Sequence, residues 1–221
     1  MRPFQKADGS VNISSREYDI ATSTQIKKGQ VVKIASGLVV LASATETGNI
    51  LGVAAENHSG SADALNPRAN GKKILVFDCP DAIFASKVPT FEATGGSATT
   101  ITTDELGAFS NDDFNGGYVK LIKKAAGSTN TDPIGAVKQI TDYGYNATGT
   151  VSTFTVASGG TANDGDVYEL YPPVGLTKGT LDEGISNYKV SAASCNALRV
   201  VGRDENMGEV HVIPVKHTLG K

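Results

Sequence analysis

Residues 26–42 read IKKGQVVKIASGLVVLA, in which two short apolar runs flank Ala35-Ser-Gly. The runs, Val31 to Ile34 and Leu38 to Leu41, are of strand length and rich in β-branched residues, which pack well on a pleated surface. Gly29 and Gly37 stand before the two runs, where turns are expected. This stretch therefore predicts two β-strands joined by a turn.

Similar apolar runs recur along the chain, and glycine, asparagine, aspartate or proline bounds each of them. They are Ile50 to Val53, Ile74 to Phe77, Tyr118 to Ile122, Ile134 to Val137, Val151 to Val156, Val167 to Tyr171, Tyr188 to Val190, Leu198 to Val201 and Val210 to Val215. No window of twelve residues keeps the apolar spacing of a helix, and the best helical candidate, from Thr103, is cut short by Gly107. We predict a mainly β chain with very little helix: a small β-barrel or sandwich module followed by a second β-rich domain.

Three segments of the first half have counterparts, in the same order, in the second half. GQVVKI (29–34), ILGVAA (50–55) and ILVFDCP (74–80) are followed by GGYVKL (116–121), PIGAV (133–137) and VYELYP (167–172). Duplication and coincidence are both compatible with this similarity. The expected organisation is an N-terminal arm at 1–17, a β-module at 18–92, a linker or exposed arm at 93–117 and a second β-rich domain at 118–221.

Charge and length exclude several classes of partner. The chain has 221 residues with 20 basic and 23 acidic side chains, a net charge of −3, and the two signs are mixed along it. This balance argues against a protein that binds nucleic acid by neutralising phosphates. No apolar run approaches the roughly 20 residues that a membrane span requires, so we expect a soluble chain with no membrane partner.

No catalytic or metal-binding constellation stands out. Cys79 and Cys195 are too few for a disulfide scaffold or a metal motif. His211 and His217 lack neighbouring ligand clusters, and no GxSxG motif is present. Asn163-Asp-Gly-Asp166 and Asp204 to Glu209 are both interpreted as hairpin turns. We therefore expect no cofactor and no enzymatic activity.

Residues 15–85 resemble the small β-barrel decoration, or cement, proteins of tailed-bacteriophage capsids. The resemblance lies in YDIA (18–21), IKKGQVVKIASG (26–37), LVVLA (38–42), NILGVAAE (49–56) and GKKILVF (71–77). These stretches follow the family's order of a "kGqvV" strand, a small-residue hairpin, an "iLGvA" strand and a further strand. Two features depart from the family: about 130 further residues follow, and Asp78-Cys-Pro80 replaces the usual glycine.

The resemblance implies a structural virion protein that is made in the host cytoplasm, binds the outer capsid surface and stabilises the head. Its partners would be the major capsid protein and further copies of itself at a symmetry axis, and it supplies no catalytic residues. Within the polar N-terminal arm, Arg2, Phe4 and Arg16 are the candidate capsid contacts, with Phe4 as an apolar anchor.

Two other classes stay open. One is another β-type virion component, such as a head-fibre base or a tail protein. The other is a carbohydrate-binding or enzymatic β-domain, which the 6% aromatic content and the absence of tryptophan disfavour, because sugar sites commonly use stacked aromatic rings.

Overall fold

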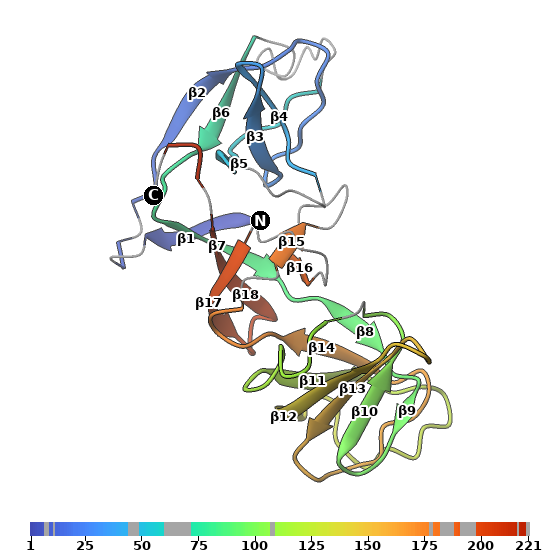
Figure 1. The fold of residues 1–221 in the computed structure, drawn as a ribbon. Helices are drawn as coiled ribbons and strands as arrows, with labels where there is room; N and C mark the ends of the chain where they lie inside the picture. Colours follow the sequence, from blue (N-terminus) through green and yellow to red (C-terminus); the bar gives the residue numbers. More distant parts are fainter. Residues whose placement is uncertain are drawn as a thin grey trace.

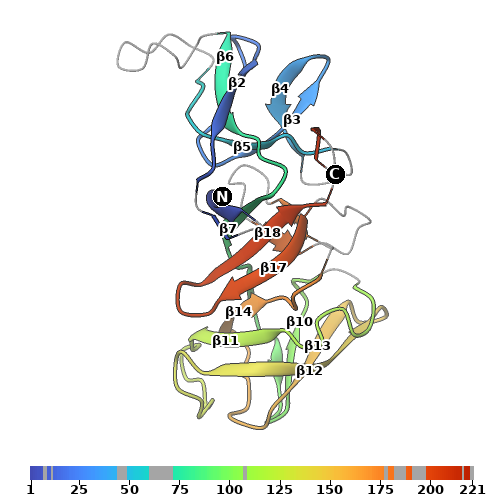
Figure 2. The same cartoon turned by 90° about the vertical axis from the view of Figure 1, so that its left-hand side faces the viewer.

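The computed structural model describes residues 1–6, 9–10, 12–43, 49–59, 72–106, 109–176, 179–181, 188–190, 198–215 and 217–219 (Figure 1). Every regular element in these ranges is a β-strand, which confirms the prediction of a mainly β fold. The search of the same ranges found no helix that could span a membrane. The strands form three sheets, which follow one another along the molecule in Figures 1 and 2.

The first sheet has five strands in the order β2-β6-β5-β3-β4. They are β2 (Ser15–Asp19), β3 (Val31–Ala35), β4 (Leu38–Leu41), β5 (Gly52–Ala54) and β6 (Lys73–Phe77). Ser36 and Gly37 have φ values of 50° and 80°, the positive angles that a two-residue type I′ turn requires between β3 and β4. Among the described residues, the two edges of the sheet meet at one isolated bridge, Ile20 to Val39, and no strand ladder closes the sheet into a barrel.

Alternation along β3 and β5 buries both faces of this sheet. Val32 and Ala54 belong to a small hydrophobic core formed within the first part of the chain, whereas Val31 and Val53 belong to the large core that also contains Phe84 of the next sheet. Because adjacent side chains in a strand point to opposite faces, the five-stranded sheet encloses one core and covers another. A strand that is buried on both faces is expected to be continuously apolar. The first two residues of β3, Val31 and Val32, fit this expectation.

The second sheet has six strands drawn from both ends of the chain, in the order β1-β7-β18-β17-β15-β16. They are β1 (Arg2–Lys6), β7 (Ala82–Lys87), β15 (Gly179–Leu181), β16 (Tyr188–Val190), β17 (Leu198–Asp204) and β18 (Glu209–Pro214). Asp204 pairs with Glu209, so the hairpin turn expected there is present. The C-terminal residues continue to the first sheet, where His217 bridges to Ile50.

The third sheet has seven strands in the order β8-β14-β11-β12-β13-β10-β9. They are β8 (Thr90–Glu92), β9 (Gly95–Gly96), β10 (Thr100–Thr103), β11 (Tyr118–Lys123), β12 (Val137–Asn146), β13 (Val151–Val156) and β14 (Val167–Tyr171). Its core is aromatic: Phe114 lies within 5 Å of Phe109 and of Tyr143, and 5.6 Å from Phe154, measured between ring centroids.

The seven-stranded sheet is an insertion into the six-stranded sheet. The chain enters it after β7, through Val88-Pro89, and leaves it after β14, through Pro172-Pro173. The two crossings are adjacent, because the Leu170 amide donates to the Pro89 carbonyl at 2.9 Å. We call residues 90–171 the distal domain, and the five- and six-stranded sheets together the body.

The segment 93–117, expected to be a linker or an exposed arm, belongs instead to the distal domain. It contains β9 and β10, and Ile101 and Thr103 of β10 point into the core with at most 1% of their surface exposed. Phe109 and Phe114 from the same segment are also buried. The segment is rich in glycine, threonine, serine and aspartate, which is typical of a connection, but threonine also fits a half-buried strand well.

The other expected boundaries also differ from the structure. Residues 1–17 are not a free arm, because β1 and the start of β2 are paired strands. The range 18–92 divides between all three sheets, and 118–221 divides between the distal domain and the six-stranded sheet. Arg2 of β1 pairs with Ala85 of β7, 83 positions away, and Lys87 of β7 pairs with Glu209 of β18, 122 positions away. Pairing over such separations cannot be read from local patterns.

The topology does not repeat the similarity between the two halves. The three segments of the first half form β3, β5 and β6, and β5 lies between the other two. Their counterparts in the second half fall in β11, β12 and β14, and there β11 lies in the middle. Gly52 stands where a Cβ would lie 1.9 Å from the Phe77 carbonyl oxygen, but its counterpart Gly135 occupies an open turn. The segments therefore resemble one another in sequence without taking equivalent places.

The hairpin turn expected at residues 163–166 is not formed, because the strand that follows it, β14, does not pair with the strand before it, β13.

Candidate functional site

Two of the three candidate contact residues lie on β1 at the edge of the six-stranded sheet. The Arg2 guanidinium forms a 2.7 Å ion pair with Glu209 of β18. The Phe4 ring stacks on the His211 imidazole, with centroids 4.0 Å apart and planes 23° from parallel. Phe4 is the extra residue at a β-bulge, because Pro3 pairs with Phe84 and Gln5 with Ile83. The strand is thus held by its own sheet.

Burial lowers the pKa of His211, although Glu209 and Asp204 act in the opposite direction and Arg2 reinforces the shift. Gly202 on the adjacent strand leaves room for the ring, since a Cβ there would lie 3.2 Å from His211 Nδ1. A neutral imidazole is therefore favoured in the Phe4 stack.

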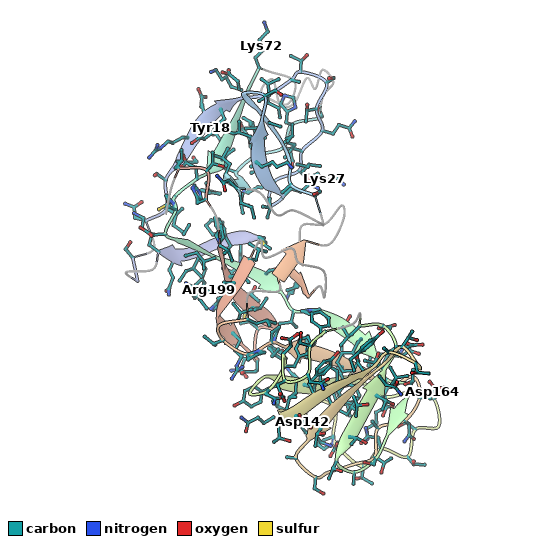
Figure 3. The ribbon with its side chains drawn as sticks, viewed as in Figure 1. Tyr18, Lys27, Lys72, Asp142, Asp164 and Arg199 are labelled. Atoms are coloured by element: carbon teal, nitrogen blue, oxygen red, sulfur yellow. The ribbon has the colours of Figure 1, made fainter. Side chains whose placement is uncertain are left out.

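The third candidate, Arg16, lies on β2 of the five-stranded sheet. Its Nε is 3.5 Å from Asp78 Oδ2, and the Tyr18 hydroxyl donates a hydrogen bond to the same oxygen. Asp78 is 1% exposed, so this pairing satisfies a buried charge that would otherwise be costly. Burial and the neighbouring Asp78 raise the pKa of Tyr18 to about 12. Figure 3 shows Tyr18 on the body, far from the distal domain.

The structure does not bring the three residues into one site. Arg2 and Phe4 belong to one sheet and Arg16 to another, and each has an intramolecular partner. The side chains of Arg2 and Arg16 are nevertheless 53% and 66% exposed. Both guanidinium groups can therefore donate hydrogen bonds to a further carboxylate. Phe4, in contrast, already packs against His211 within the protein.

The joint between body and distal domain was not found from the sequence. The tip of the β17–β18 hairpin lies on the outer face of β11 and β14, where Lys120 Nζ donates to the Glu205 carbonyl at 2.7 Å. The Tyr171 hydroxyl donates to Glu169 of its own strand at 2.6 Å and reaches the Glu205 carbonyl of the body at 3.3 Å. The Arg203 guanidinium lies 4.2 Å from the centroid of the Tyr118 ring. These contacts fix the distal domain against the body.

A second polar cluster ties together two loops of the distal domain. Asp166, fully buried, accepts hydrogen bonds from the Asn130 side chain at 2.9 Å and from the Ala125 amide at 2.9 Å. Burial alone would raise the pKa of Asp166, but hydrogen bonds led by that from Asn130 lower it overall. Asp132 forms an ion pair with Lys138 nearby, and its pKa is lowered in the same way against the effect of burial.

An open depression of about 460 Å³ lies beside this cluster. Small residues line it, mainly from Gly95, Gly96, Ala125 to Ser128 and Thr161 to Asp164. The cluster's hydrogen bonds are made within the loops, so the depression is a by-product of small side chains rather than a built ligand site. A search of the described ranges found no group of three or more His, Cys, Asp or Glu residues that could hold a metal ion.

The remaining sequence candidates are dispersed. His211 stacks on Phe4, whereas His217 accepts a hydrogen bond on Nδ1 from the Leu219 amide at 3.1 Å. Cys79 is half-buried and free, and Cys195 lies outside the described residues.

Comparisons of the chain with protein-family models, with curated proteins and with solved structures found no match in any of the three.

Proposed function

We propose that this chain is a decoration protein of a tailed-bacteriophage head, which binds the outer capsid surface and stabilises it without catalysing a reaction. The observation that carries the proposal is the five-stranded sheet. The strands that carry the quoted family motifs, β2 to β6, form one sheet and enclose a small core of their own, while Val31 and Val53 pack into the large core. A sheet formed by these consecutive strands is what the resemblance of the segment predicts.

The arrangement suits a structural role of this kind. The five- and six-stranded sheets share a core and give a stiff body, and the distal domain extends from it on two adjacent proline-containing crossings (Figure 1). Such a protein acts through many weak contacts multiplied by its copy number rather than through one tight site. Arg2 and Arg16 remain proposed contacts with the major capsid protein, and neighbouring copies would meet at a symmetry axis.

The test is the number of copies on a head. The chain is mixed with purified bare heads of a tailed bacteriophage, heads are recovered by sedimentation, and bound copies are counted by quantitative mass spectrometry. We expect several hundred copies per head, and a higher temperature of head disruption than for bare heads. Tens of copies would favour a head-fibre base or a tail component instead. No bound copies would refute the proposal.

A further inference from the structure

Exposed charge is segregated between the two parts of the molecule. On the distal domain, the exposed ionisable residues are six acids and one base: Glu92, Asp104, Glu105, Asp112, Asp142, Asp164 and Lys123. On the described part of the body they are eight bases and two acids: Arg2, Arg16, Lys27, Lys28, Lys72, Lys73, Lys87, Arg199, Glu17 and Asp19. The net charge of the whole chain, −3, does not reveal this separation.

Three of the four lysines of the distal domain have partners within the protein. Lys120 donates to the Glu205 carbonyl of the body, Lys124 donates to the Asn130 carbonyl, and Lys138 pairs with Asp132. Lys123 is the only exposed lysine of the four. The surface that this domain presents to a partner is therefore anionic.

The body differs in that several of its cations remain available. The structure gives the side chains of Lys27, Lys28, Lys72 and Arg199 no ion pair among the described residues, and all four are exposed. Figure 3 places Lys72 at the end of the body remote from Asp142 and Asp164 of the distal domain. Lys27 and Arg199 lie on different sides of the body in the same view. These exposed cations are therefore spread over the body and do not form one patch.

The attachment of the distal domain to the body at one end places the acidic and basic parts of the molecule at opposite ends (Figure 1). Both crossings enter the distal domain at the same end, beside the β17–β18 hairpin, so its opposite end is free. An anionic surface would attract the body and repel the distal domain, which sets one orientation for docking.

We propose, on the basis of the decoration function, that the body is the docking part and that it fits an anionic protein surface on the capsid, with the distal domain directed away from it. Nucleic acid is the less favoured partner. The cations are dispersed rather than aligned, and the attached anionic domain would oppose binding to phosphates.

The test compares two full-length variants of equal net charge. The body variant carries Lys27→Gln, Lys28→Gln and Arg199→Gln. The control adds three negative charges to exposed positions of the distal domain, as Thr131→Glu, Gln139→Glu and Thr161→Glu. Both are added to bare heads at several NaCl concentrations, and thermal unfolding of each confirms that it is folded.

We expect the body variant to bind heads several-fold more weakly, because the loss of three positive charges lowers the screened attraction of the body to an anionic surface, with a shallower salt dependence. The control should bind like the wild type. Equal binding by all three proteins, or weakening only in the control, would overturn this inference while leaving the decoration function standing. Failure of the wild type to bind heads would refute both. Binding of duplex DNA but not heads, lost in the body variant, would identify nucleic acid instead and overturn the inference.

Discussion

Arg203 of β17 lies over the ring of Tyr118 in β11, with 4.2 Å between the guanidinium carbon and the ring centroid. Its Nη1 also donates to the carbonyls of Gly116 and Pro172, at 3.3 and 3.4 Å. The residue therefore connects the body with both the sheet and the exit crossing of the distal domain. A guanidinium suits this place because it can stack and donate several hydrogen bonds at once.

We predict that Arg203→Ala loosens this joint and costs about 1–2 kcal/mol, the range of a partly desolvated cation–π contact together with weak hydrogen bonds. Denaturant unfolding and hydrogen exchange at the hairpin amides measure it. Arg199→Ala, on the same strand but exposed, should change stability by less than about 0.5 kcal/mol. Equal effects of the two substitutions would show that the stack does not hold the domains together.

A second prediction concerns Gly52 in the centre of the five-stranded sheet. A Cβ at this position would lie 1.9 Å from the Phe77 carbonyl oxygen, which is backbone and cannot move aside cheaply. Gly52→Ala should destabilise the chain by about 3 kcal/mol or more, or prevent folding.

Gly144→Ala is the matched control for Gly52, because Gly144 also lies in a strand and nothing stands within 4 Å of its added Cβ. It should be tolerated within about 0.5 kcal/mol. The melting temperatures of the two variants give the comparison, and a tolerated Gly52→Ala would contradict the observed strand register.

Acid should weaken the distal domain through Asp166. Its pKa in the folded chain lies below the ordinary value of 3.8, because hydrogen bonds from Asn130 and from backbone amides outweigh burial. The stabilisation is complete above the unfolded-state pKa and is lost as the pH falls through the folded-state pKa. We predict that wild-type stability declines below about pH 4, and that Asp166→Asn, although less stable at pH 7, shows a smaller decline.

Denaturant midpoints between pH 7 and pH 2 test this pH dependence. Asp164→Asn, which removes an exposed carboxylate two residues away, should leave the wild-type profile unchanged. A profile for Asp166→Asn that runs parallel to the wild type would exclude Asp166 as a source of acid sensitivity.

His211 and His217 should make the stability of the fold depend on pH between about pH 7 and pH 5 as well. Burial lowers the pKa of His211 and of His217 below the ordinary 6.5. As the pH falls below 6.5 the unfolded chain binds protons first, so stability decreases until the folded-state pKa is passed. The wild type should thus be less stable at pH 5 than at pH 7.

His211→Phe keeps an aromatic ring against Phe4 and removes the titration. We expect this variant to lose less stability than the wild type between pH 7 and pH 5, as measured by urea midpoints in the same buffers. A loss as large as that of the wild type would assign the effect to other groups.

The strands themselves could be predicted, because apolar runs such as Val31 to Ile34 are local signals. Their pairing could not, since the sheet that joins β1, β7 and β18 depends on contacts between residues far apart in the chain. The distal insertion was missed for a related reason: its crossings are marked only by Pro89 and by Pro172-Pro173. Ile101, Phe109 and Phe114 were the available signal that segment 93–117 is packed.

The sequence was enough to select Arg2, Phe4 and Arg16 as candidate contact residues, but it did not reveal their partners within the protein. Glu209, His211 and Asp78 lie 207, 207 and 62 positions away from Arg2, Phe4 and Arg16 respectively. The segregation of exposed charge was equally hidden, because it depends on which lysines the distal domain uses internally.

The most direct measurement is a cryo-electron microscopy reconstruction of heads that carry this chain, compared with bare heads. We predict additional density in several hundred copies on the outer surface, with the body against the capsid and the distal domain projecting outward. An outer surface identical to that of bare heads would contradict the proposed function.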